Sequence, residues 1–140
     1  MNQAEINGNT ITIPALLKFL PEVDEFVEAK LREWETDGST IADIAISVSE
    51  LITNSITHGS KINPDAPVIL KIELIKNNVV INIFDKGQGF DPNEIDDPLA
   101  EENLLKDTGR GIFIVKTLMD EVNVETTSDG TKIQIKKAIN

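Results

Sequence analysis

Between residues 41 and 56, apolar side chains recur at intervals of three and four residues, which predicts an amphipathic helix. The apolar stripe of this helix consists of Ile41, Ile44, Ala45, Val48, Ile52 and Ile56. At about 100° per residue, its opposite side carries Asp43, Ser47, Glu50, Asn54 and Thr57. Glu50 and Asn54 are one turn apart on this polar side, and His58 follows one turn later, somewhat rotated. A carboxylate and a carboxamide are therefore expected close to each other.

A second helical pattern precedes this one, because apolar residues occur at helical spacing over residues 15–35. Pro21 implies a break or a restart near the front of that helix. Residues 36–39 are predicted to form the turn that closes it, and Thr40 with Asp43 is predicted to cap the next helix. The chain thus places two consecutive helices before its central strands.

Alternation of apolar and polar residues predicts strands on either side of these helices. The predicted strands are residues 10–13 after an Asn7-Gly8 turn, 68–76 and 79–85 as a hairpin around Asn77-Asn78, and 122–127 and 131–137 as a closing hairpin. A further helix is predicted from Thr108 to about Met119. Helices and strands segregate along the chain, so we expect an α+β fold with a mixed, mostly antiparallel sheet covered on one face by helices.

Two glycine-bearing segments add candidate chemistry to this framework. Asp85 ends a strand and is followed by Gly87 and Gly89, as expected for a hydrogen-bond acceptor beside a segment that closely approaches a flat or bulky group. Gly109 and Gly111 lie in the first turn of a helix, where unhindered amides form a ready phosphate site. The oxygens of the polar helix side suit Mg²⁺, which keeps several waters and is usually completed by substrate phosphates. Together the segments offer a metal ligand and base, an acceptor and an anion cradle.

Each of these patterns also has a purely structural interpretation. Glu50 and Asn54 fit the solvated face of an amphipathic helix, and Asp85 fits a turn former. Gly109 and Gly111 fit a flexible hinge, although each carries a helix-propensity cost of about 1 kcal/mol. Independent structural explanations do not predict one ordered set of residues, which favours a common site.

Three motifs occur in order along the chain: E-L-I-T-N at 50–54, D-x-G-x-G-F at 85–90 and G-R-G-I at 109–112. They resemble the N, G1 and G2 boxes of the GHKL (histidine kinase-like) ATPase superfamily. The string GRGIFIVKTLMDEV and the closing GTKIQIKK resemble its stand-alone anti-sigma factor serine/threonine kinase branch (RsbW/SpoIIAB-like). The resemblance covers nearly the whole chain. It implies the Bergerat fold, a two-layer α/β sandwich with ATP between helices and sheet.

The resemblance also implies a role for each matching residue. Glu50 resembles the general base, Asn54 the Mg²⁺ ligand that bridges to the phosphates, and Asp85 the acceptor of the adenine amino group. Residues 91–108 resemble a lid, and Thr131 resembles the threonine that reaches the adenine region through water. The other expected ATP-binding residues are His58, Gly87, Gly89, Phe90, Thr108, Gly109, Arg110, Gly111 and Ile112.

Length and composition bound the class of protein. The 140 residues are expected to form one domain, large enough to bury roughly two-thirds of its unfolded surface. No apolar run approaches about 18 residues and no basic-then-apolar leader opens the chain, so we expect no membrane span, no secretory signal and a cytoplasmic location. The absence of cysteine excludes disulfides, thiolate zinc sites and cysteine nucleophiles.

The formal net charge of −11 argues against nonspecific binding to nucleic acid or to an acidic membrane, which requires a basic face. ATP is itself an anion, so the same charge opposes its binding at long range. Local groups offset this repulsion, because Mg²⁺ neutralises part of the triphosphate and the amides of residues 109–112 supply dipoles. Lys86, Lys106 and Arg110 also lie in or beside the motifs.

The function implied by the resemblance is that of an ATP-dependent protein serine/threonine kinase. Such a protein phosphorylates a STAS-domain antagonist and sequesters a sigma factor or another regulated protein, commonly as a homodimer. A sensor histidine kinase would need a dimerisation helix carrying its phosphoacceptor histidine, whereas the single histidine here lies beside the N box. Two alternatives stay open: a nucleotide-gated binding module of the same fold without kinase activity, and a purely structural partner protein that binds no nucleotide.

Overall fold

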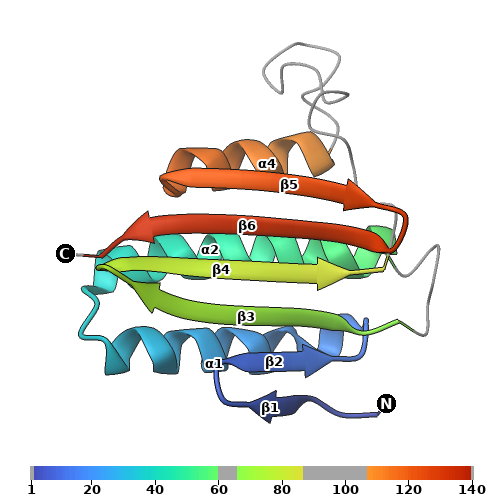
Figure 1. Cartoon of the computed structure of the whole chain (residues 1–140), viewed down its shortest axis with the longest axis horizontal. Helices are drawn as coiled ribbons and strands as arrows, with labels where there is room; N and C mark the ends of the chain where they lie inside the picture. The colour runs from blue at the N-terminus through green and yellow to red at the C-terminus, as the bar shows by residue number, and fades with distance from the viewer. Residues whose placement is uncertain (1, 60–65, 87–106, 140) are drawn as a thin grey trace.

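Strands and helices separate into two layers, with the sheet in front of the helices in Figure 1. The computed structural model describes residues 2–59, 66–86 and 107–139. The strands are β1 (Glu5–Asn7), β2 (Thr10–Ile13), β3 (Val68–Ile75), β4 (Asn78–Asp85), β5 (Glu121–Thr127) and β6 (Gly130–Ala138). The helical segments are a 3-10 turn (Leu17–Phe19), α1 (Leu20–Glu33), α2 (Gly38–Asn54), a π-helical segment (Ser55–Gly59) and α4 (Asp107–Leu118). Among these described residues, none of the helices is long and apolar enough to cross a membrane.

The sheet has the strand order β1-β2-β3-β4-β6-β5, and each neighbouring pair runs antiparallel. The chain passes from β2 to β3 through α1 and α2, and from β4 to β5 through α4, which leaves the three described α-helices on one side of the sheet. The predicted α+β sandwich is confirmed, with a sheet that is entirely rather than mostly antiparallel in the described residues. Strand β1 was not predicted, because its three residues are all exposed and leave no apolar pattern.

The core lies between the sheet and the helices. Val79, Ile81 and Ile83 of β4 face the helices and are at most 1% exposed, which confirms the predicted alternation. They belong to one cluster with Ile44 and Val48 of α2, both completely buried. Apolar burial of this kind, worth roughly 25 cal/mol per Å², is what holds the two layers together.

Two helix starts differ from the sequence prediction. Asp37 caps α2, because its carboxylate accepts a hydrogen bond from the Thr40 backbone N–H at 2.8 Å and a second from the Thr40 hydroxyl at 3.0 Å. The predicted cap of Thr40 with Asp43 was wrong, since a cap residue must precede the helix in extended backbone, as Asp37 does. Helix α4 begins at Asp107, so Thr108 lies in its first turn and not at its cap.

The β3–β4 hairpin is confirmed, but its turn lies one residue earlier than predicted. Ile75 pairs with Asn78, which leaves Lys76 and Asn77 as the two turn residues. Both have positive φ, 50° and 65°, as a two-residue type I′ turn requires. Asn77 alone carried the turn signal in the sequence, because lysine rarely adopts this conformation.

Lys137 of β6 fixes the position of the helices along the sheet. Its Nζ donates a hydrogen bond to the carbonyl oxygen of Leu118, at the end of α4, over 2.6 Å. The same Nζ lies 3.8 Å from Oδ2 of Asp43 in α2. A cation at the last turn of α4 also complements that helix dipole. The far end of β6 therefore lies over the first part of α2 and the end of α4.

Candidate functional site

The polar side of α2 is a packed surface rather than a solvated face. Ser47 is completely buried, and its hydroxyl donates to the carbonyl oxygen of Asp43 at 2.9 Å. Glu50 and Asn54 lie farther along the same side and are partly buried. These polar side chains are covered because another helix, α4, packs on α2 at this side.

Gly111 brings the start of α4 against Glu50 and Asn54. A Cβ atom at residue 111 would lie 3.1 Å from Glu50 Oε2 and 3.2 Å from Asn54 Nδ2. Both approaches are tighter than ordinary van der Waals contact, so glycine alone leaves the two side chains undisturbed. Ile112, the next residue, is 4% exposed and packs into the core, which holds this turn in place. The structure thus joins the first and third sequence motifs.

Asp85 and Thr131 form a second group, as paired residues at the end of β4 and the start of β6. Both continue the helix-facing alternation of Ile83 and are only 9% and 3% exposed. Gly130 has a φ of 143°, and a Cβ there would lie 2.8 Å from the Cα of Lys86. Only glycine lets the β5–β6 turn approach the end of β4 this closely. The sequence indicated Gly130 as a turn residue but carried no signal for this close packing.

The two groups lie at the same end of the helix–sheet interface. The pair of Lys137 and Asp43 joins β6 to α2 and gives a common reference point. From it, Asn54 lies about 16 Å along α2 at about 1.5 Å per residue. Thr131 lies about 20 Å back along β6 at about 3.3 Å per residue. Figure 1 shows α2 behind β4 and β6 and running along them, with α2 and β4 ending on the same side. Asn54 and Asp85 are the last residues of these two elements.

Asn54 has a buried side-chain nitrogen that lacks a partner in the described part of the chain. It is the last residue of α2, where the helix widens into a π-helical segment, a form that often occurs at functional sites. Within the residues that the structure describes, its Nδ2 makes no hydrogen bond. Rotation of the carboxamide exchanges its nitrogen and oxygen, so Asn54 can present either a donor or an oxygen ligand beside Gly111. A carboxamide whose nitrogen has no partner among the described residues, beside the Glu50 carboxylate, fits Mg²⁺ with nucleotide phosphates, since Mg²⁺ takes oxygen ligands and few of them from protein.

Some predicted site residues lie outside the described part of the chain. Those wholly outside it are Gly87, Gly89 and Phe90, together with residues 91–106 of the expected lid. Thr108, Gly109 and Arg110 lie in the first turn of α4, and His58 in the π-helical segment, with side chains outside the described set. The helix predicted to start at the third motif is confirmed.

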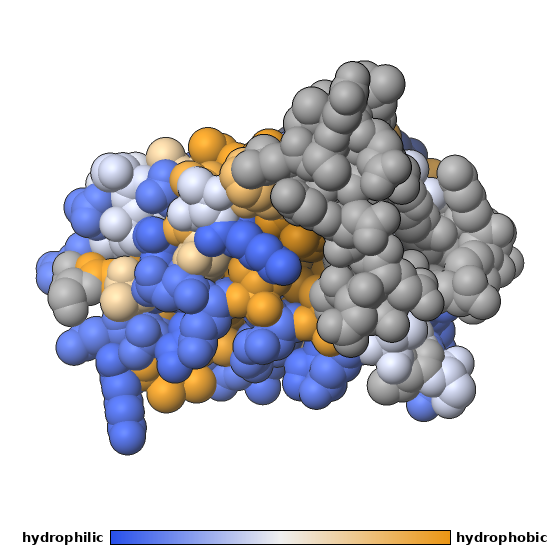
Figure 2. All heavy atoms as spheres, turned by 90° about the horizontal axis from the view of Figure 1, so that it is seen from above, coloured by the Kyte–Doolittle hydropathy of each residue, from blue (hydrophilic) through white to orange (hydrophobic). Residues whose placement is uncertain are grey.

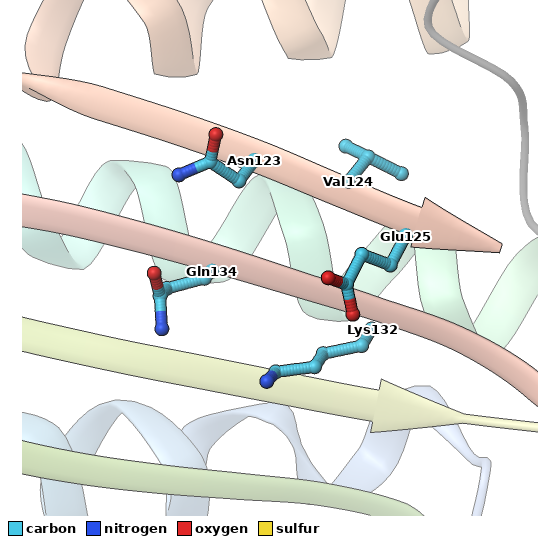
Figure 3. A pocket seen from close by; sticks show the side chains of 5 residues that line it. All are labelled: Asn123, Val124, Glu125, Lys132 and Gln134. Carbon is cyan, nitrogen blue, oxygen red and sulfur yellow. The ribbon is translucent and has the colours of Figure 1, made fainter.

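A separate hollow of about 350 Å³ lies on the outer face of the sheet (Figure 3). Its lining residues are Asn123, Val124, Glu125, Lys132 and Gln134. Asn123 pairs with Gln134 across β5 and β6, and the Gln134 side chain donates to Asn82 Oδ1 at 3.0 Å. The hollow is therefore a space between side chains of paired strands, on the face opposite to that of Asp85 and Thr131.

Known proteins resemble this chain over most of its length. The family model of the histidine kinase-like ATPase domain matches residues 13–137. An anti-sigma F factor of Clostridium botulinum (strain Eklund 17B / Type B) is 32% identical over 117 residues, which are 81% of this chain and 82% of the relative. The serine-protein kinase RsbW of Staphylococcus aureus (strain JH9) is 35% identical over 106 residues, which are 71% of this chain and 66% of the relative.

A solved structure agrees with this assignment at the level of the fold. The crystal structure of the RsbU and RsbW domains of a Mycobacterium tuberculosis protein matches with a TM-score of 0.67 at 21% identity. The match covers 93% of this chain and 32% of that longer chain. At such identity the likeness bears on the fold alone. The family match and the curated relatives show that this chain belongs to the histidine kinase-like ATPase domain family, in the branch of the anti-sigma F factors and RsbW.

Proposed function

We propose that this protein is an ATP-dependent protein serine/threonine kinase of the anti-sigma factor type. The observation that carries the proposal is the contact of Gly111 with Glu50 and Asn54, at the same end of the fold as Asp85 and Thr131. Residues from three separated motifs thereby lie at one end of the helix–sheet interface, which supports a common nucleotide site. Relatives named anti-sigma F factor and serine-protein kinase support the same assignment.

In this proposal, Asp85 and Thr131 bind the base. The carboxylate of Asp85 accepts a hydrogen bond from the adenine amino group, and the Thr131 hydroxyl reaches the base through water. Both side chains are buried on the helix side of the sheet, where a hydrogen bond is not weakened by competition with solvent. Gly87, Gly89 and Phe90 follow Asp85 directly and are proposed to pass along the base.

Asn54 and the first turn of α4 are proposed to bind the triphosphate end. The amides of residues 108–112 point toward the N-terminus of α4, where the helix dipole favours anions. Asn54 would hold Mg²⁺ through its side-chain oxygen. When bound, Mg²⁺ neutralises charge on the phosphates and helps to orient them for transfer. Gly111 keeps this space open, since a Cβ there would meet both Glu50 and Asn54.

Glu50 is proposed to act as the general base. Its Oε2 lies beside Gly111 and one turn before Asn54, which puts the carboxylate at the phosphate end of the site. During transfer, the hydroxyl oxygen of the substrate serine forms a bond to the terminal phosphorus, and the bond from that phosphorus to the ADP oxygen breaks. The hydroxyl proton passes to the Glu50 carboxylate. Positioned general bases contribute about 10²- to 10⁴-fold in rate.

The proposed protein substrate is a serine of a STAS-domain antagonist, and the regulated protein is a sigma factor or another target, bound by a homodimer of this chain. Phe113 and Ile114 follow Gly111 on α4 and are 40% and 37% exposed. Figure 2, which views the molecule from the side of α4 and β5, shows apolar side chains gathered among hydrophilic ones. Exposed apolar residues next to the transfer site suit the docking of a protein substrate.

Phosphate transfer tests the proposal directly. The purified chain is incubated with Mg·ATP and a STAS-domain antagonist, and phosphoserine is detected by mass spectrometry. We expect transfer by the unchanged protein and a loss of at least about 10²-fold in Glu50→Gln, with nucleotide affinity retained. Nucleotide binding without transfer would favour the gated binding module instead. Undiminished transfer by Glu50→Gln would contradict the role of Glu50.

A further inference from the structure

The sheet has two edges, and the longer one is formed by β5. At the opposite edge, β1 has only three residues, and so short an edge strand offers little backbone for another chain to pair with. Strand β5 has seven residues, and its only strand neighbour in the described part of the chain is β6. It contains no proline and no lysine, two residues that commonly protect edge strands. One side of β5 is therefore suited to pairing with a further strand.

The register of the sheet shows which backbone groups of β5 lie on this side. Successive residues of a strand direct their N–H and C=O groups to opposite neighbours. The Ile139 amide donates to the Asn77 carbonyl oxygen at 2.9 Å, in the register of the β4–β6 pairs, so the odd-numbered residues of β6 bond to β4. The even-numbered residues of β6 therefore bond to β5, where their partners are odd-numbered. The N–H and C=O groups of Val122 and Val124 are directed away from the sheet and form the free edge of β5.

The side chains of β5 divide into an apolar and an acidic face. Val122 and Val124 pair with core isoleucines of β6 that are almost completely buried, yet both valines are only partly buried themselves. Glu121 and Glu125 alternate with the valines and are exposed on the outer face of the sheet. Figure 2 looks onto this edge and shows apolar side chains exposed among hydrophilic ones. A strand added here would cover apolar side chains on the helix side and meet carboxylates on the outer side.

The charges of β5 distinguish between possible occupants. If a second copy added its own β5 antiparallel, pairing Val122 with Val124 of the copy would place Glu121 opposite Glu125 of the copy. Such residues would form non-hydrogen-bonded pairs, whose Cα atoms are about 4.5 Å apart, and like charges directly opposite are destabilising. The formal net charge of −11 adds to the repulsion between copies. Lysine or arginine in those positions would instead form favourable cross-strand pairs.

We propose that the free edge of β5 binds an extended segment of another protein in which apolar and basic side chains alternate. The segment forms main-chain hydrogen bonds with Val122 and Val124 and packs its apolar side chains beside theirs. Its basic side chains lie opposite Glu121 and Glu125. In this mode of recognition, main-chain hydrogen bonds supply affinity and alternate side chains supply specificity. The proposal goes beyond the proposed kinase function and does not depend on nucleotide binding.

A short synthetic peptide that alternates lysine and valine is the probe. Its dissociation constant is measured by calorimetry, and hydrogen exchange of the Val122 and Val124 amides is followed by NMR with and without the peptide. One control peptide alternates glutamate and valine. The other is the lysine peptide with N-methyl groups on its valines, which keeps the charge but removes the backbone donors that would face β5.

Protein variants test the backbone and the charges separately. Val124→Pro removes one N–H at the free edge and no bond to β6, and proline is tolerated in edge strands at such positions. Ile6→Pro is the matched control, because Ile6 faces the outer edge of β1 by the same alternation. Joint replacement by Glu121→Lys and Glu125→Lys reverses two exposed charges and serves if Val124→Pro does not fold.

We expect the lysine peptide to bind and to slow exchange of the Val122 and Val124 amides. Val124→Pro should weaken this binding about five- to tenfold, the size of one net hydrogen bond, and Ile6→Pro should change it less than about twofold. The charge-reversed protein should lose the lysine peptide and bind the glutamate peptide.

Three results would overturn the proposal. The first is that the unchanged protein does not bind the lysine peptide. The second is that the N-methylated peptide binds as tightly as the unmodified one, which would reduce the interaction to attraction between charges. The third is a dimer of the unchanged protein that Val124→Pro dissociates, because the free edge would then be occupied by a second copy.

Discussion

Replacing Gly111 by alanine separates the stability of this fold from its proposed function. The new Cβ would lie 3.1 Å from Glu50 Oε2 and 3.2 Å from Asn54 Nδ2, which are the far ends of two side chains. The end of each of these side chains must move by a few tenths of an ångström, which should lower the free energy of unfolding only slightly. Alanine is also favoured over glycine within a helix by about 1 kcal/mol. We therefore expect the free energy of unfolding to stay unchanged or to rise by up to about 1 kcal/mol.

The same methyl group should damage catalysis, because it displaces both the proposed base and the proposed metal ligand and occupies space beside the phosphates. Misplacement of catalytic groups by about 1 Å can cost about 10²-fold in rate, so we expect at least about a tenfold loss of antagonist phosphorylation. Thermal unfolding and single-turnover transfer are measured on Gly111→Ala and on Gly38→Ala, the matched control. A Cβ at Gly38 would meet nothing within 4 Å, so this control should keep full activity. Transfer by Gly111→Ala within twofold of the unchanged protein would refute the reasoning.

Three further perturbations have expected outcomes. Lys137→Met removes the 2.6 Å hydrogen bond to Leu118 and should lower the free energy of unfolding by about 1–2 kcal/mol, measured by urea titration. Burial raises the pKa of Asp24 above its ordinary 3.8, and the negative charge of the neighbouring Glu28 adds to this effect. Ionisation of the Asp24 carboxyl therefore lowers the free energy of unfolding at a pH above the raised pKa. Asp24→Asn should therefore raise the melting temperature at pH 7, with a gain that shrinks as the pH falls toward 3.8; a gain independent of pH would contradict this. Phe113→Ala should raise the KM for the antagonist without changing ATP affinity. Ile75→Ala, which also truncates an exposed apolar side chain but at the end of β3, should leave both constants unaltered.

Much of the fold could be predicted from the sequence, because the apolar patterns are local. Alternation through Val79, Ile81 and Ile83 identified β4 and its helix-facing side. The order of strands could not be predicted, since insertion of β6 between β4 and β5 depends on packing of distant segments. The capping role of Asp37 was missed because Asp37 and Thr40 are both good cap residues, and only the backbone conformation distinguishes them.

Only part of the candidate site could be predicted from the sequence, because contacts between distant segments leave no local pattern. The pattern of α2 gave a polar side with Glu50 and Asn54, but not that α4 covers it or that Ser47 within it is completely buried. Gly111 was indicated as a helix-start glycine, whereas its approach to Asn54 is a contact between distant segments.

Nucleotide binding at the meeting point of α2 and α4 is the central claim, and a thermal melt tests it most directly. The unchanged protein and Asn54→Ala are heated with and without Mg·ATP and Mg·ADP. At a hundredfold excess over the dissociation constant, a ligand adds about 2.7 kcal/mol, which raises the midpoint of a domain this size by several degrees. We predict a magnesium-dependent rise that Asn54→Ala abolishes. We expect Asn54→Ala to fold, because the side-chain nitrogen that it removes has no partner among residues 2–59, 66–86 and 107–139. An unchanged midpoint at saturating nucleotide, or an equal rise in Asn54→Ala, would contradict the claim.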